Sequence, residues 1–294
     1  MDINYELYKV FYHVAESLSF SEASRRLYIS QSAVSQSIKT LEKKLGQTLF
    51  FRNTKKVSLT PAGELLQKHI EPAVRLISQG EEQLCGTDLF SFDRIHIAAS
   101  DTICRYFMVP YLKQFHEIYP RVSVRITNAP SLSCAELLTQ GKVDLIISNY
   151  PNNRLNPDFI VRYLAEFSDV FVANPNDFPD AAETLSLKEI SRHPILMLDK
   201  NSTTSRFLHQ LFLNHQLELA PEFQLHSNDL LIDLARIGLG IAFVPDYCIR
   251  SKDCGLTVIK TKETLPRRRM AAAINPSLPM SPSLSAFLDL LPAL

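Results

Sequence analysis

The chain lacks several features that define broad classes of protein. No segment approaches the roughly 18 uninterrupted apolar residues of a membrane-spanning helix. Its five cysteines are an odd number without C-x-x-C spacing, which suits buried thiols in a reducing compartment better than disulfides, a redox pair or a metal site. The N-terminus has an acid at position 2 and no basic stretch, unlike a signal peptide. We therefore expect a cytoplasmic protein without a membrane partner.

Signatures of common enzymes are also missing. The sequence contains no GxGxxG, GxxxxGK[ST], GxSxG or HExxH segment, which argues against the usual nucleotide-binding and hydrolase motifs. The eight histidines show no spacing typical of metal ligands. We therefore expect no catalytic residues, no metal site and no cofactor.

The charge of the chain is balanced overall but uneven along its length. Lysine and arginine total 31, as do aspartate and glutamate. The first 60 residues carry nine basic and five acidic side chains, an excess of +4, so the remainder carries −4. The 294 residues, 46% of them hydrophobic, suffice for two or three domains. The N-terminal domain is the part that favours a polyanion.

Hydrophobic spacing in this domain predicts a helix-turn-helix. Apolar residues at i, i+3, i+4 and i+7 in residues 7–14 are typical of an amphipathic helix. Ser19 or Ser21 can cap a second helix, and Ser19 with Glu22 has the spacing of a capping box. A third apolar stripe occupies residues 34–45, with Ser30 as its N-cap and Gly46 as its C-terminal stop.

The third predicted helix exposes Ser32, Ser35, Gln36 and Lys39 opposite its apolar stripe. The N-terminal half of this helix is the part that enters a major groove in the motif. Glutamine pairs with adenine through two hydrogen bonds, serine bonds base edges or phosphate, and lysine reaches guanine or the backbone. The pattern favours a DNA-reading face over the alternative, an ordinary solvated helix face.

A basic turn follows the third helix. Residues 50–60 hold two β-prone runs around a turn, which predicts a hairpin wing with Arg52, Lys55 and Lys56 near its tip. Such a wing lies on phosphates or in the adjacent minor groove. Its cations would supply salt-dependent affinity for DNA.

Residues 11–66 resemble the winged helix of LysR-type transcriptional regulators, with the pattern A-x-x-L-x-x-S-Q-x-A-x-S-x-x-I-x-x-L-E-x-x-L-G-x-x-L-F-x-R and then L-T-x-A-G. Members often carry proline where Ser32 stands and arginine where Gln36 or Ser37 stands, so the third helix is less cationic than is usual in the family. Ser24 stands where a second alanine, after Ala23, is common in the family. The matching positions are Ala23, Leu27, Ser30, Gln31, Ala33, Ser35, Ile38, Leu41, Glu42, Leu45, Gly46, Leu49, Phe50, Arg52, Leu59, Thr60, Ala62 and Gly63. We expect DNA contacts from Ser30, Gln31, Ser32, Ser35, Gln36, Lys39, Arg52, Lys55 and Lys56.

A long helix is predicted next, at residues 61–88, after a winged helix at residues 1–60. Apolar residues spaced four, three, four, three and four between Leu66 and Leu84 are typical of a coiled-coil seam. Pro72 should kink this helix or divide it in two. The stripe either packs on the chain's own second domain or, as the resemblance implies, pairs with another copy. We prefer the second interpretation, a homodimer or a homotetramer.

From about residue 92, short β-prone runs alternate with helical ones, which indicates an α/β fold with mostly parallel strands. Residues 137–147 and 237–247 resemble elements of the family's effector domain, which implies a type II periplasmic-binding-protein-like fold with two α/β lobes around a cleft. The whole chain is thus expected to be an α+β multidomain protein. We expect the chain to cross between the lobes near residues 160–162 and 265–267. The lobes are assigned to 89–161 with 266–294, and to 162–265.

Hydroxyl and amide side chains stand just before several predicted helices, where strands end and ligands bind. Each could be an ordinary N-cap, but the resemblance implies that they share one cleft. Free N–H groups at helix starts favour an anionic group, such as a carboxylate. The expected effector-binding residues are Ser100, Thr102, Ser131, Ser133, Ser202, Thr203, Thr204 and Asn228.

We therefore predict a transcriptional regulator of the LysR type that binds double-stranded operator DNA and a small metabolite. The alternative is a cytoplasmic solute-binding protein or a small-molecule enzyme on the same two-lobed fold.

The three arginines at 267–269 are expected to be a solvated start of a strand rather than a second nucleic-acid patch. Sensing through a cysteine thiol is possible but not favoured.

Overall fold

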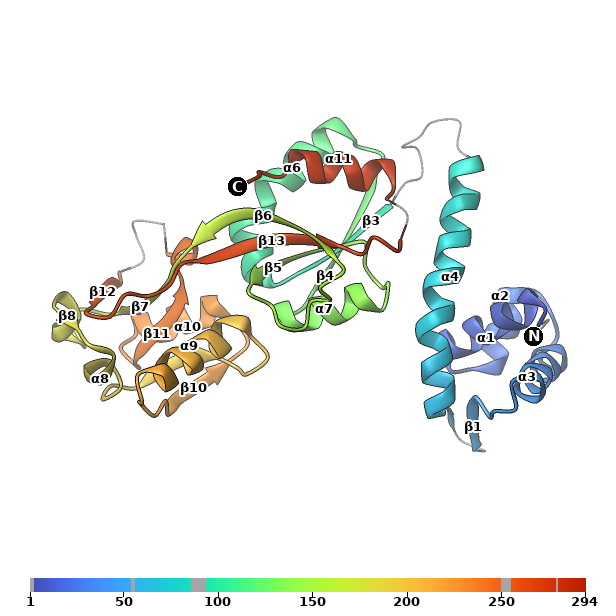
Figure 1. Ribbon diagram of the computed structural model, residues 1–294, viewed down its shortest axis with the longest axis horizontal. Coiled ribbons are helices and arrows are strands. Elements are labelled where there is room, and N and C mark those ends of the chain that lie inside the picture. Colours follow the sequence, from blue (N-terminus) through green and yellow to red (C-terminus); the bar gives the residue numbers. More distant parts are fainter. Residues whose placement is uncertain (1–2, 54–55, 86–93, 250–254, 279) are drawn as a thin grey trace. The chain divides into compact units, whose positions relative to one another are not determined.

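The structure, a computed structural model, describes residues 3–53, 56–85, 94–249, 255–278 and 280–294 (Figure 1). Within these ranges no helix is long and apolar enough to cross a bilayer. The chain forms two compact units, and the first holds the elements that precede β3. These are α1 (Tyr5–Ser17), α2 (Phe20–Leu27), α3 (Gln31–Leu45), β1 (Phe50–Asn53), β2 (Lys56–Leu59) and α4 (Pro61–Cys85).

Helices α1, α2 and α3 enclose one small core beside the hairpin. Phe11 is fully buried and its ring lies 5.4 Å from that of Phe50 on β1. The apolar stripes of α1 and α3 both face inward, as their spacing predicts. The predicted helix-turn-helix and wing are therefore confirmed. The buried members of this core are Val10, Phe11, Val14, Ala15, Ala23, Val34, Ile38, Leu41, Leu49 and Phe50.

The caps of these helices also agree with the sequence. The Ser19 hydroxyl accepts a hydrogen bond from the Glu22 amide at 3.2 Å, which starts α2. Gly46 ends α3 with φ at 66°, in the left-handed region where a side chain is disfavoured.

The L-T-x-A-G motif forms the joint between the wing and α4. The Gly63 amide donates to the Thr60 hydroxyl at 3.0 Å, and that hydroxyl donates to the Thr48 carbonyl at 2.6 Å. The Leu49 carbonyl accepts from the Thr60 amide at 3.0 Å, and a Cβ at position 63 would lie 2.2 Å from the same oxygen. Glycine at 63 therefore lets α4 start directly against the core.

Helix α4 is one element that contains Pro72, so of the two predicted alternatives, a kink or a division, the division into two helices is wrong. Proline removes one backbone donor, and the helix continues on both sides of it. Leu66 and Ile70, from the N-terminal half of the predicted seam, pack against the core of the same unit. Ile77 is 44% exposed and Leu65 is 61% exposed. The N-terminal half of the predicted seam therefore packs on the core of its own chain, while Ile77 in the other half is exposed.

The second unit contains two sheets. In the first, of order β4-β3-β5-β13-β6, the strands β3, β4 and β5 are parallel, and β13 runs antiparallel to β5 and β6. The second has the order β10-β9-β11-β7-β12-β8. The strands are β3 (Arg94–Ala99), β4 (Ser123–Asn128), β5 (Leu145–Tyr150), β6 (Ile160–Phe167), β7 (Asp169–Ala173), β8 (Thr184–Leu185), β9 (Ile195–Leu198), β10 (Pro221–Leu225), β11 (Ile241–Pro245), β12 (Thr257–Thr261) and β13 (Arg268–Ile274).

Helices cover both faces of the first sheet. Helices α6 and α11 lie over one face and α7 over the other (Figure 1). Alternate residues of β3 enter the two cores: Ile97 joins Phe115 of α6, while Ala98 joins Leu138 of α7. The helices of the second unit are α5 (Asp101–Ile103), the π-helical η1 (Cys104–Met108), α6 (Val109–Ile118), α7 (Ser131–Thr139), α8 (Leu187–Ile190), α9 (Thr203–Asn214), α10 (Asn228–Arg236) and α11 (Pro282–Leu290), with short 3₁₀ turns η2 (Pro179–Ala182) and η3 (Asp246–Cys248).

The chain passes between the sheets twice. The first crossing lies at Ser168, between β6 and β7, and not at 160–162, which falls inside β6. The sequence places this boundary poorly because only one residue, Ser168, separates the two β-prone segments that form β6 and β7. The second crossing precedes Arg268, between β12 and β13. The two-lobed α/β fold is confirmed.

Candidate functional site: a helix face and an interlobe cavity

Helix α3 presents a polar face to solvent. Val34, Ile38 and Leu41 are fully buried. Ser32, Gln36 and Lys39 are exposed on the other side of the helix, and Ser35 is half-buried. Gln36 and Lys39 therefore present hydrogen-bonding groups on this face, together with Ser32, whose hydroxyl lies 2.9 Å from the Ser30 hydroxyl.

Two of the predicted DNA-contacting residues hold the local structure. The Ser30 hydroxyl accepts from the Ala33 amide at 3.2 Å, so it caps α3. The Gln31 side-chain oxygen accepts from the Ser21 hydroxyl at 3.0 Å, which ties α3 to α2. Both side chains remain exposed and close to the face, but these bonds occupy part of their capacity.

Tyr28 is a candidate that the sequence patterns do not reveal. It ends α2 with φ at 55° and its side chain is 95% exposed, in the turn that leads into α3. An exposed aromatic ring with a hydroxyl at this turn is placed to contact a phosphate. Its sequence signal is weak, because a tyrosine at the end of an amphipathic helix is typical of a core position.

The wing pairs Phe50 with Leu59 and Arg52 with Val57 in antiparallel register. Thr54 and Lys55, at the turn itself, lie outside the described residues. The backbone therefore supports a hairpin at the predicted place. In the sequence, Arg52, Lys55 and Lys56 lie at or next to the turn of this hairpin.

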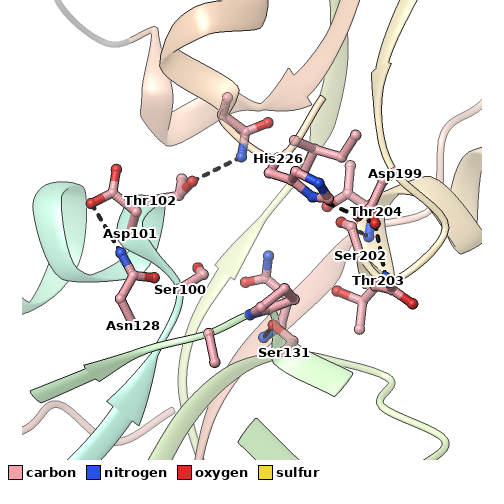
Figure 2. A pocket seen from close by; sticks show the side chains of 16 residues that line it. Ser100, Asp101, Thr102, Asn128, Ser131, Asp199, Ser202, Thr203, Thr204 and His226 are labelled. Atoms are coloured by element: carbon pink, nitrogen blue, oxygen red, sulfur yellow. Dashed lines mark hydrogen bonds and ion pairs between the residues drawn. The ribbon is translucent and has the colours of Figure 1, made fainter. Parts of the chain in front are cut away.

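A cavity of about 440 Å³ lies between the two lobes of the second unit (Figure 2). Asn228 of α10 donates to the Thr102 hydroxyl at 2.9 Å, a bond that joins the lobes at the cavity wall. The volume falls in the range of small-molecule sites. The lining residues are Ser100, Asp101, Thr102, Asn128, Ala129, Pro130, Ser131, Asn149, Leu198, Asp199, Asn201, Ser202, Thr203, Thr204, His226 and Asn228.

The predicted effector residues converge on this cavity, except for Ser133, which is not among its lining residues. Ser131 is the first residue of α7 and lines the cavity. Ser133 follows it by two positions, about 200° around the helix, and therefore points away from the cavity. Ser100 caps α5 and Ser202 caps α9. Helix starts from both lobes therefore open onto one space.

Further contacts join the lobes close to the cavity. The Tyr106 hydroxyl donates to Asp229 at 2.5 Å, and Arg105 lies 3.6 Å from the same carboxylate. Arg206 of α9 donates to the Asn153 side chain at 3.1 Å. Tyr106 belongs to the π-helical turn η1, a distortion that is frequent at functional sites.

The lining also contains polar residues that the sequence patterns do not predict. Asp199 follows β9 directly, and its carboxylate accepts from Asn201 at 2.9 Å and lies 3.5 Å from His226. Asp101 accepts from Asn128, at the end of β4, at 3.4 Å. Because ligands bind at the carboxyl ends of parallel strands, the position of Asp199 after a buried strand was the available signal.

Two family models match the chain. One, described as a bacterial regulatory helix-turn-helix protein of the lysR family, matches residues 5–64. The other, described as the LysR substrate binding domain, matches residues 92–294, more than half of the chain. The chain belongs to the LysR family. It is a DNA-binding, ligand-responsive transcriptional regulator of the LysR type.

Individual relatives agree with this assignment. The transcriptional regulator CysL of Bacillus subtilis is 26% identical over 249 residues, which cover 84% of this chain and 82% of CysL. A full-length OxyR structure from Pseudomonas aeruginosa has a TM-score of 0.73 at 21% identity and covers 99% of this chain and 94% of its own. The regulatory domain of CcmR from Synechocystis, solved with 2-PG, has a TM-score of 0.61 at 21% identity and covers 67% of this chain and 94% of its own.

The thiols of this LysR-type regulator are poorly ionised where they are described. Burial raises the pKa of Cys104 to about 11 and that of Cys134 to about 12, and it also raises the pKa of Cys248. All three are free cysteines. Among the described residues, no group of three or more histidine, cysteine or acidic side chains is arranged to hold a metal ion.

A buried ion pair lies beside the cavity of the regulator. Arg268, predicted to be solvated, is 3% exposed and donates to Asp169 at 2.7 Å and to the Thr204 hydroxyl at 3.1 Å. Its guanidinium lies 5.2 Å from the ring centres of both Phe167 and Phe207. Burial raises the pKa of Asp169, against the opposing effect of Arg268. The prediction failed for Arg268 because strand alternation turns the middle of the three arginines inward.

Proposed function

We propose that this regulator reads operator DNA with the outer face of α3 and the wing. The observation that carries the proposal is the exposure of Ser32, Gln36 and Lys39 opposite a fully buried stripe. Glutamine and lysine at such a face provide base-edge contacts in a major groove. The full proposed set is Ser30, Gln31, Ser32, Ser35, Gln36, Lys39, Arg52, Lys55 and Lys56.

The regulator acts as a homo-oligomer in this proposal, with α4 as an interface. Ile77 continues along α4 the stripe that begins with Leu66 and Ile70, and it is 44% exposed. An apolar stripe that remains exposed on a helix favours burial against another surface. A dimer with two-fold symmetry would match a roughly palindromic operator.

The interlobe cavity is the proposed effector site. The regulatory domain of CcmR, which has the same fold, was solved in complex with 2-PG, and this supports a small-molecule ligand for the domain. Its proposed ligand-binding side chains are Ser100, Thr102, Ser131, Ser202, Thr203, Thr204 and Asn228, with a carboxylate as the favoured ligand group. A ligand alters DNA binding only if it binds one arrangement of the two lobes more tightly than another. In this proposal the cavity binds its ligand without converting it. The protein acts in the cytoplasm.

The proposal is tested by selecting bound genomic fragments with the purified full-length protein. We expect enrichment of a small set of sites over scrambled competitor at moderate ionic strength. Genes beside those sites then indicate candidate metabolites, whose effect on DNA affinity is measured by fluorescence anisotropy. Absence of any sequence preference, with or without metabolites, would contradict the proposed function.

A further inference from the structure

The cavity lining carries carboxylates but no strong cation. Among the sixteen described residues that line it, Asp101 and Asp199 are acidic, His226 is the one titratable base, and none is lysine or arginine. Asp101 and Asp199 lie on opposite sides of the cavity (Figure 2). A ligand that is only an anion would therefore meet two negative charges without an opposing guanidinium or ammonium group.

The guanidinium group of Arg268, which lies behind the cavity lining, does not make the charge of the cavity positive. Arg268 touches the Thr204 hydroxyl, but its charge is neutralised by Asp169 at 2.7 Å. The side chains of this pair are 2% and 0% exposed. A pair buried together in this way presents little net positive charge to the cavity.

Asp199 is a fixed acceptor in the wall. Its side chain is 17% exposed, accepts from Asn201 at 2.9 Å and lies 3.5 Å from His226. A partly buried carboxylate interacts with a ligand charge more strongly than an exposed one, because solvent screens it less. It is therefore placed to bind a cationic group of a ligand.

A second acceptor lines the same cavity. Asn228 is 4% exposed, and while its amide nitrogen donates to Thr102, its amide oxygen has no hydrogen-bond partner within the described part of the chain. A buried acceptor without a donor is costly, and a ligand N–H group would relieve that cost. A carboxylate cannot do so, because it has no donor.

Donors for a carboxylate are present as well. Helices α7 and α9, of nine and twelve residues, begin at the cavity with Ser131 and Thr203. Their first turns carry backbone N–H groups and the positive ends of their dipoles. Ser202 adds a hydroxyl group at the same end of α9.

We propose that the effector is a zwitterionic amino acid. Its ammonium group lies against Asp199 and Asn228, and its carboxylate lies against the start of α9. This inference rests on the proposed function of the cavity as an effector site, and it adds the requirement for a positive group on the ligand.

The ligand requirement is tested by isothermal titration of the full-length protein with the standard L-amino acids, β-alanine and γ-aminobutyrate. Each amino acid that binds is compared with its des-amino carboxylic acid and its decarboxylated amine. Loss of either group should weaken binding by about tenfold or more, since each removes charge-assisted hydrogen bonds. A des-amino acid that binds as tightly as its amino acid overturns the inference.

The role of Asp199 is tested with Asp199→Asn, which keeps the shape of the side chain and removes its charge. We expect about tenfold weaker binding of the amino acid and little change for the des-amino acid. Asp289→Asn, at an exposed position on α11, is the matched control and should bind like the unaltered protein. Equal effects of Asp199→Asn on both ligands contradict the assigned contact, and thermal melting checks that the variant is folded.

Dicarboxylates and sugar phosphates, titrated alongside the amino acids, separate the existence of the effector site from the nature of its ligand. If dicarboxylates or sugar phosphates bind and alter DNA affinity while no amino acid does, the zwitterion is wrong and the cavity remains an effector site. If no compound of either class binds, the effector site itself is contradicted, and the inference falls with it.

Discussion

At the scale of single residues, neighbours on α3 have separate tasks. The Ser30 hydroxyl is engaged as a cap and Gln31 is tied to α2, while Gln36 is exposed further along the same helix. Substitutions at 30 or 31 therefore change helix geometry together with any DNA contact. Gln36 offers a cleaner test of base reading.

Replacement of Gln36 by Ala should cost about 1–3 kcal/mol on the selected operator and relax the preference at one base pair, because glutamine can pair with adenine through two hydrogen bonds. Anisotropy titrations of operators that differ at single positions measure both effects. Gln210→Ala, at an exposed position on α9, is the control and should leave affinity unchanged. An equal loss on every sequence would show that Gln36 contacts only the backbone.

The described thiols should resist oxidation. Since burial raises the pKa of Cys104 to about 11, only a small fraction of this thiol is ionised at neutral pH, and the thiolate is the reactive form. Alkylation of Cys104 should accelerate as the pH rises toward that value, as followed by mass spectrometry. Mild peroxide at neutral pH should leave Cys104, Cys134 and Cys248 reduced, and rapid oxidation of any of them would contradict this prediction and support thiol sensing.

At the scale of elements, spacing and caps identified what is local. Residues 7–14 and 34–45 became buried stripes, and the hairpin formed at 50–59, because these features depend on neighbours in sequence. The partners of α4 did not follow from its sequence. Leu66 and Ile70 fit a coiled-coil seam and an intramolecular contact equally well, and only the folded first unit shows that they pack on its core.

Gly63 is predicted to be intolerant of a side chain. A Cβ at this position would lie 2.2 Å from the backbone carbonyl oxygen of Leu49 and 2.9 Å from a side-chain methyl carbon of Leu59, and the backbone oxygen cannot move without disturbing the wing joint. Gly63→Ala should lower the free energy of unfolding of the first unit by about 1–3 kcal/mol. Gly80→Ala, in the same helix but with nothing within 4 Å, should be neutral or stabilising. Urea unfolding measures the free energy of unfolding of both variants. Equal stabilities would show that a side chain at position 63 does not clash with the wing joint.

The wing should bind DNA without regard to sequence. Lys55→Ala or Lys56→Ala should weaken all duplexes alike and lower the slope of log affinity against log salt by about 0.9 for each phosphate that is no longer neutralised. Lys113→Ala, exposed on α6, removes an equal charge from the second unit and should leave the slope unchanged. An unaltered slope in the wing variants would show that these lysines do not bind phosphates.

At the scale of the whole molecule, the sequence alone left long-range pairings open. Hydroxyls before helices could be assigned to a cleft through the resemblance, and all but Ser133 line it. Asp101 and Asp199 were missed because a lone acid after a strand has no distinctive spacing. The pairing of Asp169 with Arg268 joins residues 99 positions apart, and no local pattern encodes such a distance.

The Asp169–Arg268 pair should be the costliest polar contact to break in the second unit. It links β7 and β13, the strands that follow the two crossings, and it bonds Thr204 at the cavity. Arg268→Met alone should cost about 3–5 kcal/mol, because it leaves the Asp169 charge buried without a partner.

The double variant Asp169→Leu with Arg268→Met should recover much of that loss, because neither charge then remains buried. Arg269→Met is the matched control: Arg269 is exposed and lies 3.6 Å from Glu166, so its replacement should cost about 1 kcal/mol or less. Urea unfolding followed by circular dichroism gives the free energies. If Arg268→Met costs no more than Arg269→Met, the pair does not stabilise the crossing between the lobes.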